Sequence, residues 1–211
     1  MNLTKHPAGL ILTAALLAAT TLSGCAPLVL GGAVGGAFMV TDRRTSGAQV
    51  EDQGIELKAA SRVREAMGER GHVNVTSYNR VALITGEVPS EADKLTVEQV
   101  VARTENVRSV VNELALMGNA SMASRGSDII VQAKVKATFV DARDLQANAF
   151  KVVVERGEVY LMGLVTEREA TRAAELASTV SGVQKVIKVL HIISEEELAR
   201  KQPAAPASSP K

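Results

Sequence analysis

The sequence predicts an α+β fold of two tandem small domains, each with the element order helix–strand–strand–helix–strand (αββαβ). Segments with helical and with alternating hydrophobic periodicity follow one another in this order twice. Short apolar motifs also recur at similar offsets in the two halves. A hairpin pairs antiparallel, whereas a strand–helix–strand connection favours a parallel crossover. Each half should therefore hold a mixed three-stranded sheet packed with two helices.

The internal repeat is carried by three pairs of motifs. They are Arg62–Arg64 with Lys134–Lys136, Val81–Gly86 with Glu158–Gly163, and Val107–Val111 with Val183–Ile187. Their offsets are 72, 77 and 76 residues. We interpret the differences as changes in loop length between two copies of one unit.

The first domain is predicted at residues 54–118. Ala59, Val63 and Met67 recur at four-residue spacing, which predicts an opening helix with one apolar stripe. Ser90 stands at a capping position before the apolar residues of a second helix. The expected strands are Asn74–Tyr78, Val81–Thr85 and Val107–Met117.

The second domain is predicted at residues 127–193. Val131 and Val135 mark its first helix, and Thr166 with Glu169 forms a capping box that opens its second helix. The expected strands are Phe150–Val154, Glu158–Leu161 and Val183–Ile193. Phe139 and Phe150 are predicted to lie in the core.

The first 24 residues are typical of a signal peptide. Lys5 precedes the apolar run Leu10–Ala19, which is too short to span a bilayer. Leu22–Cys25 then reads Leu-Ser-Gly-Cys, which is similar to the bacterial lipobox. This resemblance implies cleavage before Cys25, a diacylglycerol on its thiol and a third acyl chain on its amine. Ala26 stands where an inner-membrane retention signal would place Asp, so we expect an outer-membrane anchor facing the periplasm.

Three further segments are predicted to lie outside the domains. Residues 25–53 are expected to form a lipidated tether and linker, and residues 119–126 a second linker. Residues 194–211 end in a Pro/Ala/Ser-rich stretch with nothing to bury, so we expect a disordered tail.

Composition argues against several classes of function. The chain has 24 Lys+Arg against 23 Asp+Glu, a balance unlike that of a nucleic-acid binder. One Cys and three His leave little for a metal site, and aromatic residues make up only 2%. No Ser, Cys or carboxylate stands at a spacing that would build a triad. We therefore expect no catalytic residues, no metal, no cofactor and no enzymatic activity, and we interpret His72 and His191 as structural.

The order of elements, with a glycine closing the second strand, resembles the BON domain. The strongest match is Gly157–Ala170, which reads GEVYLMGLVTEREA. Residues 41–47, TDRRTSG, also resemble the linker that precedes the domains in dual-BON outer-membrane lipoproteins. The resemblance implies phospholipid binding, a role in outer-membrane integrity and in processes linked to cell division, and enrichment at the division site. Gly86 and Gly163 in these motifs are interpreted as structural rather than ligand-binding.

The first helix of the second domain is the candidate lipid-binding element. With Val131 and Val135 inward, its outward residues are Ile129, Ile130, Lys134, Lys136 and Val140. Apolar residues beside lysines suit an anionic bilayer interface, so the expected partners are phosphatidylglycerol and cardiolipin. The corresponding outward residues of the first domain are Glu56, Lys58, Arg62 and Glu65, a face of mixed sign. Residues 119–193 hold ten basic against eight acidic residues, and residues 54–118 eight against nine.

Two alternatives stay open at this point. The outward apolar residues of the second domain could instead pack against the first domain or the tether, because small domains bury little core alone. The chain could also be a periplasmic interaction module that presents a sheet edge or a helix to a protein of envelope assembly or cell-wall remodelling.

Overall fold

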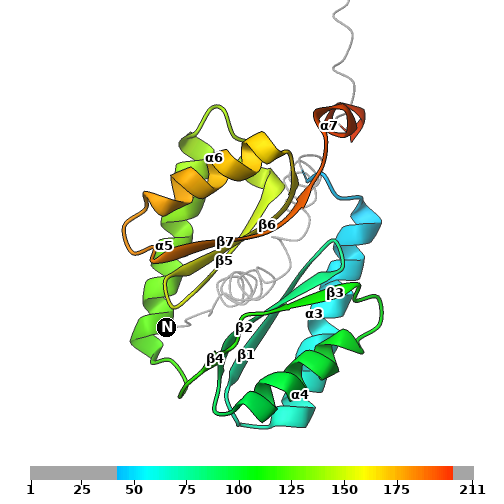
Figure 1. Ribbon diagram of the computed structural model, residues 1–211, viewed down its shortest axis with the longest axis vertical. Coiled ribbons are helices and arrows are strands. Elements are labelled where there is room, and N and C mark those ends of the chain that lie inside the picture. Colours follow the sequence, from blue (N-terminus) through cyan, green and yellow to red (C-terminus); the bar gives the residue numbers. More distant parts are fainter. Residues whose placement is uncertain (1–41, 202–211) are drawn as a thin grey trace, which may run out of the picture. The chain divides into compact units, whose positions relative to one another are not determined.

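The computed structural model describes residues 42–201, and the predicted order of elements appears in it twice (Figure 1). The first half consists of α3 (Ser46–Met67), β1 (His72–Tyr78), β2 (Val81–Val88), α4 (Glu91–Ala102), β3 (Ser109–Asn112) and β4 (Ala115–Leu116). The second half consists of α5 (Met122–Asp141), the 3-10 turn η2 (Ala147–Ala149), β5 (Phe150–Glu155), β6 (Glu158–Val165), α6 (Glu167–Ser178), β7 (Lys185–Ile192) and α7 (Glu195–Lys201). The predicted α+β class is confirmed.

Both sheets are mixed, as predicted. In the first half β1 pairs antiparallel with β2, and β2 pairs parallel with β3 and with β4. In the second half β5 pairs antiparallel with β6, and β6 pairs parallel with β7. The single strand expected at Val107–Met117 is divided into β3 and β4, because the Asn112 side chain accepts a hydrogen bond from the Leu114 backbone N–H at 3.2 Å and turns the chain.

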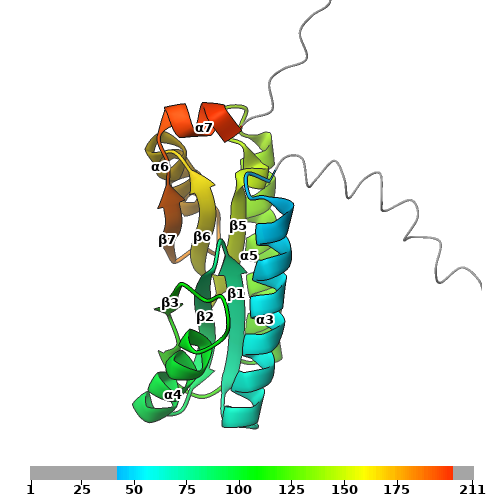
Figure 2. The same cartoon turned by 90° about the vertical axis from the view of Figure 1, so that its right-hand side faces the viewer.

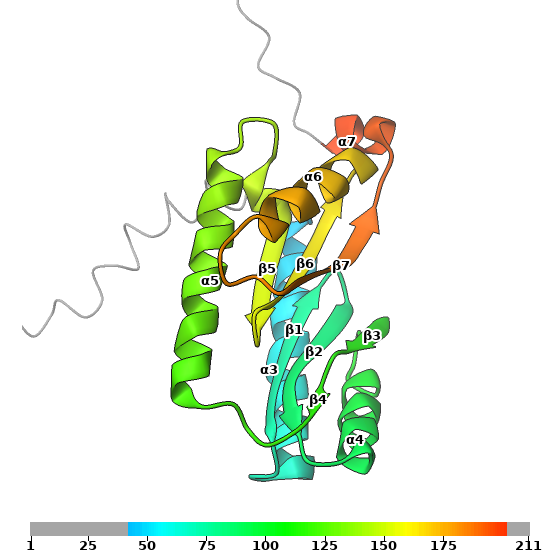
Figure 3. The same ribbon diagram turned by 60° about the vertical axis from the view of Figure 1, so that its left-hand side comes forward.

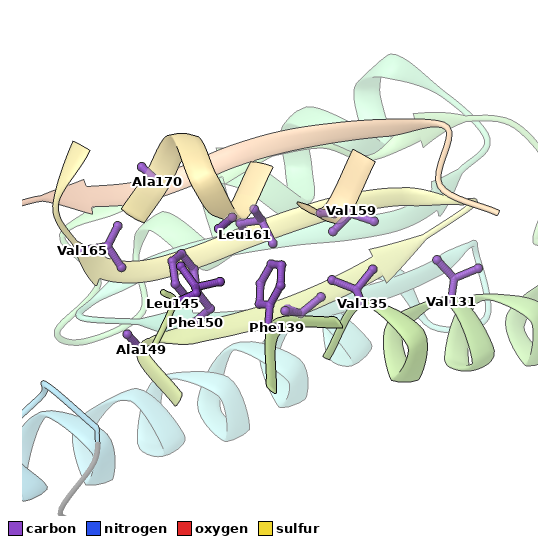
Figure 4. Close-up of a cluster of buried hydrophobic side chains, with 13 residues drawn as sticks. Val131, Val135, Phe139, Leu145, Ala149, Phe150, Val159, Leu161, Val165 and Ala170 are labelled. Carbon is purple, nitrogen blue, oxygen red and sulfur yellow. The ribbon is translucent and has the colours of Figure 1, made fainter. Parts of the chain in front are cut away.

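The helices of each half cover one face of their own sheet. Helix α3 runs along β1 (Figure 2), and α5 and α6 lie over β5, β6 and β7 (Figure 3). In the second half Phe139 of α5 points toward Leu161 of β6, and Val135 belongs to the same buried cluster (Figure 4). Phe139 packs edge-to-face on Phe150 with ring centroids 5.4 Å apart, so both belong to the core as predicted.

The other faces of the two sheets share a separate cluster of buried side chains. Leu83 of β2 lies in it with Tyr160 and Met162 of β6, all three fully buried. The hydroxyl of Tyr78, in the first half, accepts a hydrogen bond from the backbone N–H of Leu164, in the second, at 3.3 Å. Burial raises the pKa of Tyr78 to about 12, so the hydroxyl stays neutral.

One carboxylate in each half lies beneath the turn of the first hairpin. The side chain of Asp52 in α3 accepts hydrogen bonds from the backbone N–H groups of Asn79 at 2.7 Å and Arg80 at 2.8 Å. Asp128 of α5 accepts from the N–H groups of Arg156 at 2.9 Å and Gly157 at 2.8 Å. These turns leave N–H groups that strand pairing cannot satisfy, so each aspartate joins the opening helix of its half to the hairpin.

The two aspartates correct the predicted alignment of the repeat. They are 76 residues apart, so Lys58 corresponds to Lys134, and the offset of 72 for the opening helices is wrong by one helical turn. Because an α-helix repeats about every 3.6 residues, a slip of four leaves the apolar stripe nearly in phase and is hard to detect from periodicity. The residue that corresponds to Ile130 is therefore Gly54 and not Lys58.

The segments predicted as linkers and tail contain helix. Helix α3 begins at Ser46, inside the expected linker 25–53, because Thr45 accepts a hydrogen bond from the Ala48 N–H. Helix α5 begins at Met122, inside the expected linker 119–126, with Ser121 as its cap. Residues 195–201 of the expected tail form α7, which buries Leu198 against the cluster between the sheets.

Gly86 and Gly163 are sites of close backbone approach. Gly86 has φ +117°, and a Cβ there would lie 2.0 Å from the carbonyl oxygen of His72 on β1. A Cβ on Gly163 would lie 2.6 Å from the carbonyl oxygen of Ala149. The close neighbour of Gly86 is the paired strand β1, and that of Gly163 is the turn η2 before β5, which supports the structural interpretation of these glycines.

Two consecutive arginines attach the start of the described chain to both halves. Arg43 donates to both carboxylate oxygens of Glu169, at 2.7 Å each, and to the carbonyl oxygen of Leu164 at 3.0 Å. Arg44 donates to Asp52 at 2.6 Å, and its guanidinium lies 4.1 Å from the ring centroid of Tyr78. Arg43 thus contacts the second half and Arg44 the first.

We expect Asp128→Ala to lower the free energy of unfolding by about 2–4 kcal/mol, since two buried turn N–H groups lose their acceptor. Urea unfolding followed by circular dichroism measures this change. Ser127→Ala, at the exposed neighbouring position, is the matched control and should change little. Equal stability of the two variants would contradict the role assigned to Asp128.

The Arg43–Glu169 pair predicts a dependence of stability on pH. Burial opposes ionisation of Glu169, but hydrogen bonds from Arg43 and from the Thr166 N–H hold its pKa below the usual value. The pair should therefore stabilise the fold fully above the unfolded pKa of about 4.3, and this contribution should be lost as the pH falls through the lowered folded pKa.

We expect Glu169→Gln to destabilise the fold by about 3 kcal/mol at pH 7 and by much less at pH 3. Thermal unfolding midpoints of wild type and variant at the two pH values measure the gap. Glu175→Gln, on the exposed side of α6, is the control. A gap of the same size at both pH values would show that the ion pair does not carry the effect.

Candidate functional site

Helix α5 is amphipathic with its apolar inner side packed in the core. Val131, Val135 and Phe139 are 4%, 0% and 1% exposed, and Asp128 on the same side caps the hairpin turn. These four contacts fix the rotation of the helix about its axis. The side chains on its opposite side are therefore held away from the sheet.

The five residues predicted for lipid binding all lie on the exposed side of α5. The three apolar members are the most informative, because Ile129, Ile130 and Val140 are 67%, 58% and 71% exposed. Lys134 and Lys136 are exposed as well. The structure thus brings the predicted set together on one helix surface.

Three further apolar residues extend this surface beyond the predicted set. Met122 is 80% exposed, and Ala133 and Ala137 are exposed between the isoleucines and Val140. With a helical repeat of 3.6 residues, they fall on the same side as Ile129 and Val140. Met122 was missed because its segment was predicted as linker. We call the set Met122, Ile129, Ile130, Ala133, Ala137 and Val140 the α5 stripe.

The two lysines lie along opposite margins of the α5 stripe. Lys134 donates a hydrogen bond to the hydroxyl of Ser181 at 3.1 Å, on the side toward α6. Lys136 lies on the side toward α3, where it lines a groove with Gln132. Within residues 42–201 neither lysine forms an ion pair, so both ammonium groups can approach an external anion.

The α5 stripe does not pack on the first half of the described chain, because its isoleucines and Val140 are exposed. This finding argues against the alternative that the first domain covers them. Packing of the tether on the stripe would involve residues outside the described range. Cys25, the predicted lipidation site, also lies outside it.

The opening helix of the first half presents a different surface. Lys58, the counterpart of Lys134, forms an ion pair with Glu105, and Arg62 donates to the carbonyl oxygen of Arg103 at 3.0 Å. Leu57 is nevertheless 75% exposed on this helix, together with Val50 at 64%. These two exposed apolar side chains were not predicted from the sequence, where only charged residues were expected on this face.

The two histidines of the described range lie on different strands, in different halves of the chain. His72 lies 3.1 Å from the amide of Asn74, and His191 is exposed on β7. In the described part of the chain, no three His, Cys, Asp or Glu side chains converge as a metal site would require. Over the same residues, every helix is too short or too polar to cross a bilayer.

The fold and the α5 stripe define a class of small, two-domain α+β proteins with an exposed amphipathic helix. The family model for the BON domain matches residues 56–118 and 127–194. The chain therefore belongs to the BON-domain family, as the resemblance in the sequence predicted.

Curated relatives place the chain more closely within that family. It is 41% identical over 180 residues to the outer membrane lipoprotein DolP of Haemophilus influenzae, an alignment covering 83% of this chain and 93% of that protein. It is 29% identical over 154 residues to a 21 kDa hemolysin of Actinobacillus pleuropneumoniae, covering 72% and 79%. The chain is thus a dual BON-domain, DolP-like protein.

Solved structures give only a distant likeness. The C-terminal domain of CdsD, a structural protein of the type III secretion system of Chlamydia trachomatis, has a TM-score of 0.28 and 11% identity to this chain. The alignment covers 64% of this chain and 96% of that one. A similarity of this size carries no argument about function.

Proposed function

We propose that this protein is a non-enzymatic outer-membrane lipoprotein whose second BON domain binds anionic phospholipid through the α5 stripe. Its role is to support envelope integrity and processes linked to cell division. The observation that carries the proposal is the exposed apolar stripe, which has at each margin a lysine that forms no ion pair within residues 42–201. The relationship to DolP, whose name describes an outer membrane lipoprotein, supports the location.

The proposed contact follows from the physical chemistry of a bilayer interface. An amphipathic helix lies in the plane of the membrane with its apolar side chains at the boundary between headgroups and acyl chains. Ile129, Ile130 and Val140 supply this apolar contact, and a basic residue near an anionic surface contributes about 1 kcal/mol. Two lysines and a short stripe therefore give weak, salt-sensitive binding.

The covalent anchor is the second part of the proposal. Cleavage before Cys25 and acylation of its thiol and amine would attach the chain to the membrane by more than one acyl chain. Two or more chains give stable anchoring, which weak contacts of a folded domain cannot provide alone.

We expect the double variant Ile130→Glu and Lys134→Glu to reduce binding to anionic vesicles at least about tenfold. The measurement is flotation of the fragment from residue 41 onward with vesicles containing phosphatidylglycerol or cardiolipin, at low salt. Wild type should float with these vesicles and remain behind with phosphatidylcholine alone. Unchanged flotation by the folded double variant would exclude the α5 stripe as the contact.

Lys58→Glu provides the matched control for the charge. Lys58 corresponds to Lys134 in the first domain, and its replacement changes the net charge of the fragment by the same amount. We expect Lys134→Glu alone to weaken flotation more than Lys58→Glu. An equal effect of the two would indicate that only the overall charge of the fragment matters.

For the anchor, Cys25→Ala should move the full-length protein from the membrane fraction to the soluble fraction. It should also abolish labelling by a radioactive or clickable fatty acid. Cys25→Ser, which also lacks a thiol, should behave identically. A cleaved, membrane-bound product in either variant would refute lipidation at Cys25.

A further inference from the structure

Helices α3 and α5 line a groove. Its volume is about 930 Å³. Leu57, Ala60 and Arg64 of α3 form one wall, and Gln132 and Lys136 of α5 contribute to the other. Residues of the strands β1 and β5 also line it, from Val73 to Thr76 and from Lys151 to Glu155.

Both strands are the outer strands of their sheets, so one edge of each is unpaired by its own sheet. Tyr78 and Val81 close the hairpin of β1 and β2, so the alternate residues Val73, Val75 and Ser77 direct their backbone N–H and C=O groups away from β2. By the same register, Val152 and Val154 direct theirs away from β6. The two free edges line the same groove.

The two edges run antiparallel. At one end, the ammonium group of Lys151 on β5 lies 3.2 Å from the carbonyl oxygen of Ser77 on β1. At the other end, the amide of Asn74 on β1 donates to Glu155 on β5 at 3.2 Å. Between these two side-chain contacts lies the outward-facing backbone of Val75 on β1, and Val73 lies beyond Asn74.

Side chains cap only part of these edges. The N–H of Ser77 donates to Glu56 at 2.7 Å, and the carbonyl oxygen of Val152 accepts from Gln132. In the described range no side chain caps the outward groups of Val73, Val75 or Val154. Unpaired strand edges recognise the backbone of another extended segment.

The walls of the groove indicate the chemistry of such a segment. Thr85 is 1% exposed, lines the groove, and its hydroxyl has no hydrogen-bond partner in the described range. At the rim, Arg64 and Lys136 are exposed on opposite walls without an ion pair in residues 42–201. The exposed Leu57 lines the same groove from the α3 wall. The rim therefore suits an acidic side chain next to an apolar one.

We propose that this groove binds an extended segment of a protein partner that adds its backbone to the free edges of β1 and β5. The segment presents an acidic side chain to Arg64 and Lys136 and an apolar side chain to Leu57. A lipid headgroup has no backbone to pair with these edges, whereas an extended segment does. This site lies beside the α5 stripe and does not depend on lipid binding.

The test uses a display library of random linear ten-residue peptides, selected on the fragment from residue 41 onward without lipid. Ala60→Trp fills the groove, whereas Ser61→Trp adds the same ring at the next, exposed position of α3. We expect selected peptides to be enriched in acidic and apolar residues. They should bind Ser61→Trp like wild type and Ala60→Trp at least tenfold more weakly, and should protect amides of β1 and β5 from hydrogen exchange.

A second variant makes the test independent of the tryptophan. The double charge reversal Arg64→Glu and Lys136→Glu changes only exposed side chains and should weaken the same peptides at least tenfold. The proposal is overturned if no selected peptide binds more weakly both to Ala60→Trp and to the double charge reversal. It is also overturned if peptide binding is lost on Ile130→Glu but not on Ala60→Trp. Protection of both edges by phosphatidylglycerol micelles, without any peptide, would also overturn it in favour of a headgroup site.

Discussion

A buried helix carboxylate beneath a hairpin turn is the constraint on which each half of this protein depends. Asp52 and Asp128 each satisfy two turn N–H groups that the sheet leaves unpaired. The same side chain sets the rotation of its helix, because it must point at the turn while the apolar residues that follow it enter the core. The exposed α5 stripe is a result of that setting, since its residues occupy the side opposite Asp128. The proposed lipid contact thus depends on hydrogen bonds made on the other side of the helix.

The contacts between the halves use different chemistry. Leu83, Tyr160 and Met162 form an apolar contact of the two sheets, and Arg43 and Arg44 add charged contacts with one half each. Glu169 serves twice, as the capping-box residue of α6 and as the partner of Arg43. The capping-box glutamate that marks the start of α6 in the sequence therefore also forms an ion pair with Arg43, a residue far away in the chain.

Hydrophobic periodicity and capping motifs predicted the αββαβ order, the mixed sheets and the exposed residues of α5, because these depend on local patterns. The helix starts at Ser46 and Met122 were missed, since their first turns carry few core residues and read as polar linkers. The alignment of Lys58 with Lys134 was missed because a four-residue slip preserves the helical stripe. In each half an aspartate stands three residues before an apolar core residue, Asp52 before Ile55 and Asp128 before Val131. This shared spacing would have revealed the correct alignment and extended each helix toward its start. The groove could not be predicted, because it requires β1 and β5 to meet through contacts that no local pattern encodes.

The attachment of Arg43 and Arg44 to the folded unit also bounds the length of chain between anchor and domains. A residue spans at most about 3.5 Å, so the stretch from Cys25 to Asp42 can reach no more than about 60 Å. With Cys25 acylated, Asp42 would be confined to a hemisphere of that radius on the membrane, which gives the attached folded unit an effective concentration on the order of millimolar. A domain held at such a concentration needs only millimolar affinity for its target to be engaged half of the time. Evolutionary selection on the residues of α5 can then favour rapid release of the helix from the membrane as much as tight binding to it.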